Sequence, residues 1–207
     1  MHPNPAFRQA PDARALAFAA ARGFGVLTAA GAQGLLAAHV PFVLEEGRLA
    51  AHLVRSNPLA RHLAGAPAPA LMIVSGPDAY VSPDWYGEAD MVPTWNYVAV
   101  HLRGTLELLP GDRLRPHLER LSANFEARLA PKAPWTLGKM SAGAIAQKLR
   151  QIVPVEMVLS GVESTFKLNQ NRAASARAGA AAALAAGGTP GLETAALAAL
   201  MRAVENG

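Results

Sequence analysis

The chain has 207 residues, 51% of them hydrophobic, so it is long enough to bury a core without disulfides or metal ions. It contains no cysteine, which excludes disulfides, thiolate metal sites and cysteine nucleophiles. The formal net charge of +4 comes from scattered basic residues mixed with acidic ones, a pattern that does not predict binding along a row of nucleic-acid phosphates.

The first quarter of the chain is predicted to form a short helix and an antiparallel meander. Asp12 is the expected N-cap of a helix over residues 13–22, and Gly23 follows as a C-terminal stop. Alternating hydrophobicity then predicts three strands, over residues 25–30, 35–44 and 48–53. The first two strands are joined by a tight connection at residues 31–34.

The third strand leads into a segment whose residue types suit an anion. Asn57 followed by Pro58 predicts a helix start, because an N-cap side chain precedes a proline at the first helical position. Helix N-termini attract anions with their free N–H groups, and His52 and Arg55 come just ahead of this one. The segment is therefore either a phosphate cradle or an ordinary capped helix with a surface arginine.

Residues 92–104 read as a strand with two different faces. Val98, Val100 and Leu102 alternate on a face that suits a barrel interior, with Gly104 in phase. The opposite face carries Trp95, Tyr97, Ala99, His101 and Arg103. This composition is wrong for open solvent, so we expect a ligand, a partner subunit or both to cover it; an aromatic core plug is the structural alternative.

The remaining elements alternate between strands and helices. Strands are predicted over residues 70–75, 80–82, 94–109, 152–159 and 162–168, with a turn at Ser160-Gly161 before the last. Asp112 and Ser141 are the expected N-caps of two helices. The last strand ends in a polar cluster with two cations, made by Lys167, Gln170, Asn171 and Arg172.

The C-terminal segment differs in composition from the rest. Residues 173–206 are dominated by alanine and interrupted by Gly187-Gly188-Thr189-Pro190-Gly191, which predicts two short helices with a turn. We therefore expect a main domain over residues 1–172 and a helical extension over residues 173–207. No secretory signal or membrane span is recognisable, so a cytoplasmic location is expected.

The motifs that define common enzyme classes are missing from the sequence. There is no G-x-S-x-G elbow, phosphate-binding P-loop or dinucleotide G-x-G-x-x-G, and no catalytic residue is assigned, so enzyme activity stays open. His39 and His52 lie on neighbouring predicted strands, where they form either a metal pair or hydrogen-bonded packing residues. The aromatic strand, the turn at Arg55 and the basic cluster together fit a phosphorylated planar ligand.

Several sequence blocks resemble the PaiB family. They are H-V-P-F at residues 39–42, G-R-L-A-A-H-L-V-R-S-N-P at 47–58, G-P-D-A-Y-V-S-P-D-W-Y at 76–86, V-P-T-W-N-Y-V-A-V-H-L-R-G at 92–104 and F-K-L-N-Q-N-R at 166–172. Family members are described as FMN-binding negative transcriptional regulators. The resemblance implies a mainly β fold with helices, an antiparallel Greek-key-type six-stranded split barrel like that of pyridoxamine-phosphate-oxidase-like flavoproteins.

The resemblance also implies a cofactor, a partner and a set of site residues. FMN is expected at the seam of a homodimer, and the sequence does not support direct DNA binding. The implied cofactor-binding residues are His39, His52, Arg55, Ser56, Asn57, Trp95, Tyr97, His101, Lys167, Gln170, Asn171 and Arg172. Phe166, Asn169 and Pro154 depart from the family pattern and predict a locally reshaped last strand.

Two other functions remain compatible with the same resemblance. One is a flavin-dependent oxidoreductase acting on a small molecule. The other is haem binding, for which His39, His52 and His101 are available axial ligands.

Overall fold

A computed structural model describes residues 1–32 and 34–204 of the chain. The described chain forms two compact units. The first contains residues 1–15, 75–100 and those from Glu163 onward, and the second contains residues 16–74 and 101–162. Each unit is described by itself below. Among the described residues, no helix is long and apolar enough to cross a membrane.

The N-terminal elements follow the predicted order. They are a 3-10 turn η1 (Pro5–Phe7), α1 (Asp12–Arg22), β1 (Phe24–Gly31), β2 (Gly34–Glu45), β3 (Arg48–Val54) and α2 (Pro58–Leu63). α1 ends where expected, because Gly23 adopts the left-handed conformation with φ of 58°. The predicted connection over residues 31–34 includes residue 33, which lies outside the described residues.

Three long strands, β4 (Ala68–Val81), β5 (Thr94–Leu108) and β6 (Ile152–Lys167), continue from one unit into the other. The prediction of two strands in place of β4, and of two strands with a turn in place of β6, was wrong. In β4, Pro77 lies between the residues that pair with β1 (70–73) and those that pair with β7 (78–79), so its missing N–H breaks neither ladder. In β6, the strand continues through Ser160-Gly161 without a turn, and its neighbours in the sheet are β3 and β5.

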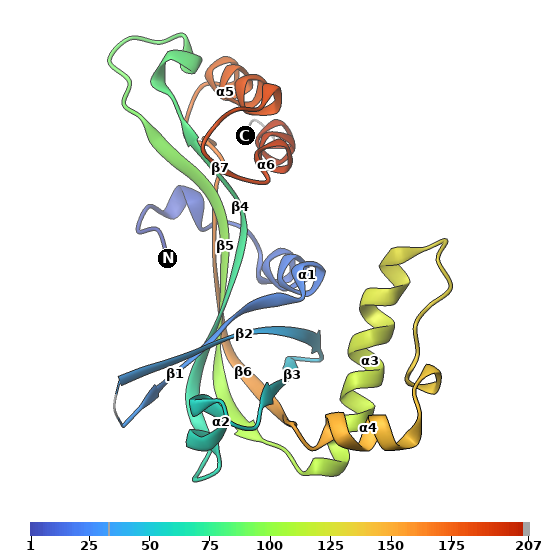
Figure 1. Ribbon diagram of the computed structural model, residues 1–207. Helices are drawn as coiled ribbons and strands as arrows, with labels where there is room; N and C mark the ends of the chain where they lie inside the picture. Colours follow the sequence, from blue (N-terminus) through green and yellow to red (C-terminus); the bar gives the residue numbers. More distant parts are fainter. Residues whose placement is uncertain (33, 205–207) are drawn as a thin grey trace. The chain divides into compact units, whose positions relative to one another are not determined.

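The strands close into a barrel, and the predicted fold class is confirmed. The strand order is β1-β2-β3-β6-β5-β4-β7, and an additional antiparallel pairing of β1 with β4 joins the two ends of the six-stranded series (Figure 1). β2 pairs with β3, and β3 pairs with β6, over residues 48–54 and 152–158. Gly104 of β5 lies so close to the backbone carbonyl of Val158 that a β-carbon there would clash with it.

The second unit contains the main apolar core. Its strands contribute side chains that are at most 2% exposed: Leu27, Phe42, Leu49, Leu53, Met72, Leu102, Leu106 and Met157. Burying a side chain of this size contributes roughly 1.5–3 kcal/mol relative to exposure, so these residues account for much of the barrel's stability.

Two further helices belong to the second unit, α3 (Leu114–Glu126) and α4 (Ala142–Leu149). Ser141 caps α4 as predicted, because its hydroxyl accepts a hydrogen bond from the N–H of Ala144 at 3.3 Å. The prediction that Asp112 caps α3 was wrong. A 3-10 turn, η3 (Gly111–Arg113), places Arg113 at the cap position, without a side-chain hydrogen bond.

The C-terminal segment folds into α5 (Ala174–Ala186), the two-residue strand β7 (Gly191–Leu192) and α6 (Thr194–Arg202), so the predicted helix pair is confirmed. α5 and α6 lie side by side, and α5 also packs on η2 (Pro83–Tyr86) (Figure 1). β7 pairs with residues 78–79 of β4. The segment is thus part of the first unit's packing, and the domain boundary after Arg172 stays a prediction.

Candidate functional site

The predicted site residues divide between the two units. His39, His52, Arg55, Ser56, Asn57 and His101 belong to the second unit, and Trp95, Tyr97, Lys167, Gln170, Asn171 and Arg172 belong to the first.

The burial of β5 follows the predicted alternation. Val98, Val100 and Leu102 are at most 2% exposed, whereas Trp95 on the other face is 46% exposed. Tyr97 and His101 are partly exposed on the same face as Trp95. An exposed tryptophan on a sheet face is an apolar surface available to a flat ligand or a partner, as the sequence predicts.

The turn after β3 is held by hydrogen bonds to the segment that joins α4 to β6. The side chain of Asn57 accepts a hydrogen bond from the N–H of Leu59 at 2.8 Å, so this predicted N-cap is confirmed. Nε of Arg55 donates to the carbonyl of Arg150 at 3.0 Å, and its Nη2 donates to the carbonyl of Ile152 at 3.3 Å. These two bonds fix the orientation of the guanidinium group, and no carboxylate among the described residues forms an ion pair with it.

A cavity of about 410 Å³ opens beside this turn within the second unit. Arg55 and Arg150 line it together with apolar side chains such as Leu108, Leu114 and Ile152, and no acidic residue of the described chain lines it. Two arginines without a carboxylate form an environment that suits a phosphate group. Ser56 is exposed in the same turn.

His52 has a partner that the sequence reasoning missed. Its Nδ1 lies 3.1 Å from Nε2 of His117 on α3, and the two rings meet edge to face. Burial lowers the pKa of His52, and burial together with the charges of His52 and Arg120 lowers the pKa of His117 to about 4. A sequence signal for His117 exists, because it lies three residues after Leu114 and four before Leu121, and all three side chains are buried on α3.

The structure gives His39 a different neighbour from that of His52. His39 is exposed on β2, and its ring lies 6.4 Å from that of Phe24. The prediction that His52 is a hydrogen-bonded packing residue is therefore confirmed, with His117 as its partner. Within residues 1–32 and 34–204, no group of three or more His, Asp or Glu side chains is placed to hold a metal ion.

The basic cluster of the first unit is partly structural. The amide of Gln170 donates to the carbonyl of Ala6 at 3.0 Å and accepts from the N–H of Leu168 at 2.8 Å, so it ties the strand end to the N-terminus. The ammonium group of Lys167 contacts the hydroxyl of Thr94, and burial and the charge of Arg172 lower its pKa. Asn171 is exposed.

Arg172 lies against a buried tyrosine. Its guanidinium carbon is 5.7 Å from the centre of the Tyr86 ring, and the hydroxyl of Tyr86 accepts a hydrogen bond from buried Asn169 at 3.3 Å. Neither Lys167 nor Arg172 forms an ion pair with any residue that the structure describes. Besides the turn at Arg55, these two cations could therefore also bind an anionic group.

Comparisons with known proteins agree on one family and one fold. A family model described as "Putative FMN-binding domain" matches residues 1–160. The chain is 33% identical over 102 residues to "Protease synthase and sporulation protein PAI 2" of Bacillus subtilis, and 34% identical over 89 residues to an uncharacterized protein of Saccharomyces cerevisiae. These alignments cover 49% and 39% of this chain, and 48% and 52% of the relatives, so the chain spans about half of their length.

Among solved structures, the FAD and heme binding protein from Mycobacterium smegmatis superposes with a TM-score of 0.58. The superposition covers 78% of this chain and 73% of that one, at 18% sequence identity. At this identity the likeness establishes the fold alone.

Proposed function

The chain belongs to the FMN-binding domain family, and from this premise we propose that it binds FMN, with the phosphate held at the turn of Arg55, Ser56 and Asn57. The observation that carries the proposal is the cavity beside this turn, which Arg55 and Arg150 line and to which no acidic side chain of residues 1–32 and 34–204 contributes. Because the bonds to two carbonyls hold the guanidinium group in place, little conformational entropy is lost when it meets a phosphate.

The exposed face of β5 supports a second part of the proposal. Trp95 and Tyr97 present aromatic surface that a flavin ring or a second copy of the chain would cover. We propose that the chain forms a homodimer whose seam includes these residues. A bound flavin would supply reversible redox chemistry, and the chain's own residues would bind and orient it.

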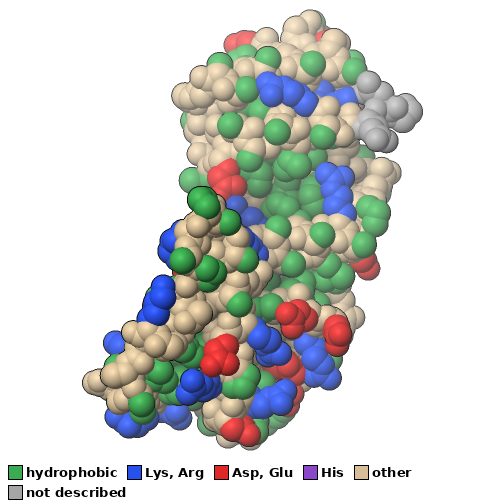
Figure 2. Space-filling model, turned by 90° about the vertical axis from the view of Figure 1, so that its right-hand side faces the viewer, with side chains coloured by type: hydrophobic (Ala, Val, Ile, Leu, Met, Phe, Trp, Pro, Cys, Tyr) green, Lys and Arg blue, Asp and Glu red, His purple; other side chains and the backbone are tan. Residues whose placement is uncertain are grey.

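The similarity to the Bacillus protein, whose name refers to protease synthase and sporulation, supports a regulatory use of this FMN binding. Direct binding to DNA is not part of the proposal. On the face shown in Figure 2, basic and acidic side chains are interspersed and do not form one continuous basic surface.

The phosphate contact is tested with Arg55→Ala. A charge-assisted arginine–phosphate contact is worth roughly 1.5–3 kcal/mol, so we expect FMN affinity to fall about ten- to a hundredfold. Riboflavin lacks the phosphate and is expected to bind the wild type and the variant equally. Fluorescence quenching of both flavins measures the two affinities, and the absorbance spectrum of the protein separates flavin from the haem alternative.

Two further variants make this experiment specific. Arg115→Ala removes an equally charged, exposed residue whose partner is Glu119 on the same helix, and it is expected to leave the preference for FMN unchanged. Lys167→Ala tests the cations of the first unit. If Lys167→Ala abolishes the preference for FMN and Arg55→Ala leaves it intact, the phosphate binds at Lys167 and the proposed turn is wrong.

A further inference from the structure

A second, smaller cavity in the barrel unit has no role in the proposed flavin site. Its volume is about 110 Å³, and it lies between α3 and the strands β3 and β6. Ala50 comes from β3, Pro154 and Glu156 from β6, and Arg113, His117 and Arg120 from the α3 region. It shares Leu109 and Pro154 with the larger cavity, but its basic residues are different.

One residue that lines this cavity carries a buried polar atom without a partner among the described residues. His117 is 3% exposed, and its Nε2 is occupied by His52. Its Nδ1 has no hydrogen-bond partner among the described residues. Since nearly all buried polar atoms in folded proteins are paired, an unpaired atom on a cavity-lining residue calls for a water molecule or an ion that satisfies it.

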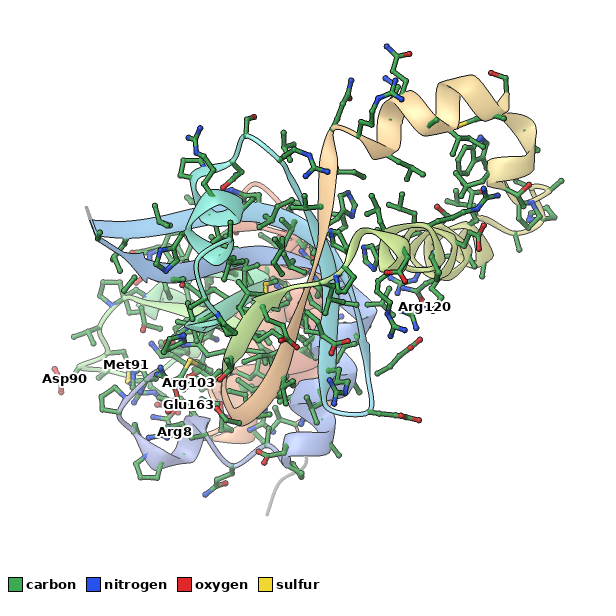
Figure 3. The ribbon with its side chains drawn as sticks, turned by 90° about the horizontal axis from the view of Figure 1, so that it is seen from below. Arg8, Asp90, Met91, Arg103, Arg120 and Glu163 are labelled. Carbon is green, nitrogen blue, oxygen red and sulfur yellow. The ribbon has the colours of Figure 1, made fainter. Side chains whose placement is uncertain are left out.

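The charges around the cavity are mainly positive. Arg113 and Arg120 line it, and Figure 3 labels Arg120, which extends from α3. Glu156 also lines the cavity, but one of its carboxylate oxygens lies 2.5 Å from the guanidinium of Arg48, so that charge is balanced. When His52 donates to Nε2 of His117, Nδ1 of His117 carries a proton and is a donor.

We propose that this cavity is a binding site for a small oxyanion of the size of sulfate or phosphate, held by His117, Arg113 and Arg120. The volume is well below the roughly 300 Å³ at which pockets begin to hold cofactor-sized ligands, so a flavin ring does not fit. The three donors match the acceptor oxygens of a tetrahedral anion. The proposal stands independently of FMN binding.

Binding at this site is expected to be linked to proton uptake. His117 is faced by His52 from β3, by Arg120 from its own helix and by the Arg48–Glu156 pair of the strands. An anion beside Nδ1 favours the charged imidazolium, and the bound state therefore takes up a proton that the free state lacks. Sulfate affinity should then rise as the pH falls from 7.5 to 5.5.

The test is calorimetric titration of the full chain with sulfate, an anion whose charge is constant over this pH range. We expect Arg120→Ala to weaken sulfate binding about tenfold or more, and the matched variant Arg115→Ala to change it less than about twofold. The absence of sulfate binding to the wild type, or equal effects of the two variants, would overturn the proposal.

Two more arms complete the experiment. His117→Gln should remove the pH dependence of sulfate binding, and a pH dependence that persists in a folded variant would count against the role of His117. FMN and riboflavin are added as competitors, because the phosphate of FMN has the same chemistry as sulfate. We expect neither to displace sulfate; displacement by FMN alone would assign the cavity to the cofactor's phosphate and refute a separate site.

Discussion

Replacing Leu184 by alanine is expected to lower the free energy of unfolding by about 3 kcal/mol, as large-to-small changes in a packed core do. Leu184 lies on α5 and is 0% exposed, as are Leu197 and Met201 of α6, on which α5 packs. The loss combines the transfer free energy of the deleted atoms with the cavity that they leave. Equilibrium unfolding in urea measures it.

A matched control comes from the same C-terminal segment. Leu192 of β7 is 70% exposed, so Leu192→Ala removes the same atoms from a surface position. We expect that variant to change stability by less than about 0.5 kcal/mol. If Leu184→Ala were as mild as Leu192→Ala, residues 173–207 would behave as a detached extension, in agreement with the domain boundary predicted from the sequence.

The second large effect is a loss of stability in acid that comes from His117. Burial, His52 and Arg120 lower the pKa of His117 to about 4, against 6.5 for an ordinary histidine. Between these values the unfolded chain binds a proton that the folded chain does not, so stability decreases as the pH falls through 6.5 toward 4. The pKa difference corresponds to about 3 kcal/mol when complete.

Urea unfolding at pH 7 and pH 5 measures this effect, and two histidine variants assign it. His117→Gln is expected to be less stable at pH 7, because His52 loses its imidazole partner, but it should lose less stability on acidification than the wild type. His39→Gln changes an exposed histidine and should keep the wild-type dependence. If both variants kept the full dependence, the acid sensitivity would come from other groups.

The local elements were readable from the sequence because their signals are local. Asn57-Pro58 and Ser141 start helices with their own side chains, and Gly23 ends one with its own backbone conformation. The two faces of β5 follow from strict alternation, which places Val98 and Val100 in the core and leaves Trp95 exposed. The barrel class followed from the resemblance of long sequence blocks, and the strand pairing confirms it.

Strand length and partners were decided by tertiary structure. Ser160-Gly161 reads as a turn in isolation, and the sequence pattern ends a strand at Ser75. In the folded chain β4 and β6 each continue through these positions as single strands within the sheet. The pairing of His52 with His117 joins residues 65 positions apart, and no local pattern encodes such a contact. No local pattern encodes the contacts of Arg55 either, because its guanidinium group donates to the distant carbonyls of Arg150 and Ile152.

The sequence by itself therefore determined the residue types of the candidate site, the alternation of the strands and the starts of the helices, since each depends on neighbours along the chain. Only the folded chain decided which polar groups remain free for a ligand. The side-chain oxygens of Asn57 and Gln170 accept hydrogen bonds from backbone N–H groups, whereas Nδ1 of His117 is buried and unpaired among the described residues. The physical reason is that a buried polar atom is satisfied by whatever the fold brings near it, and that depends on packing between distant segments.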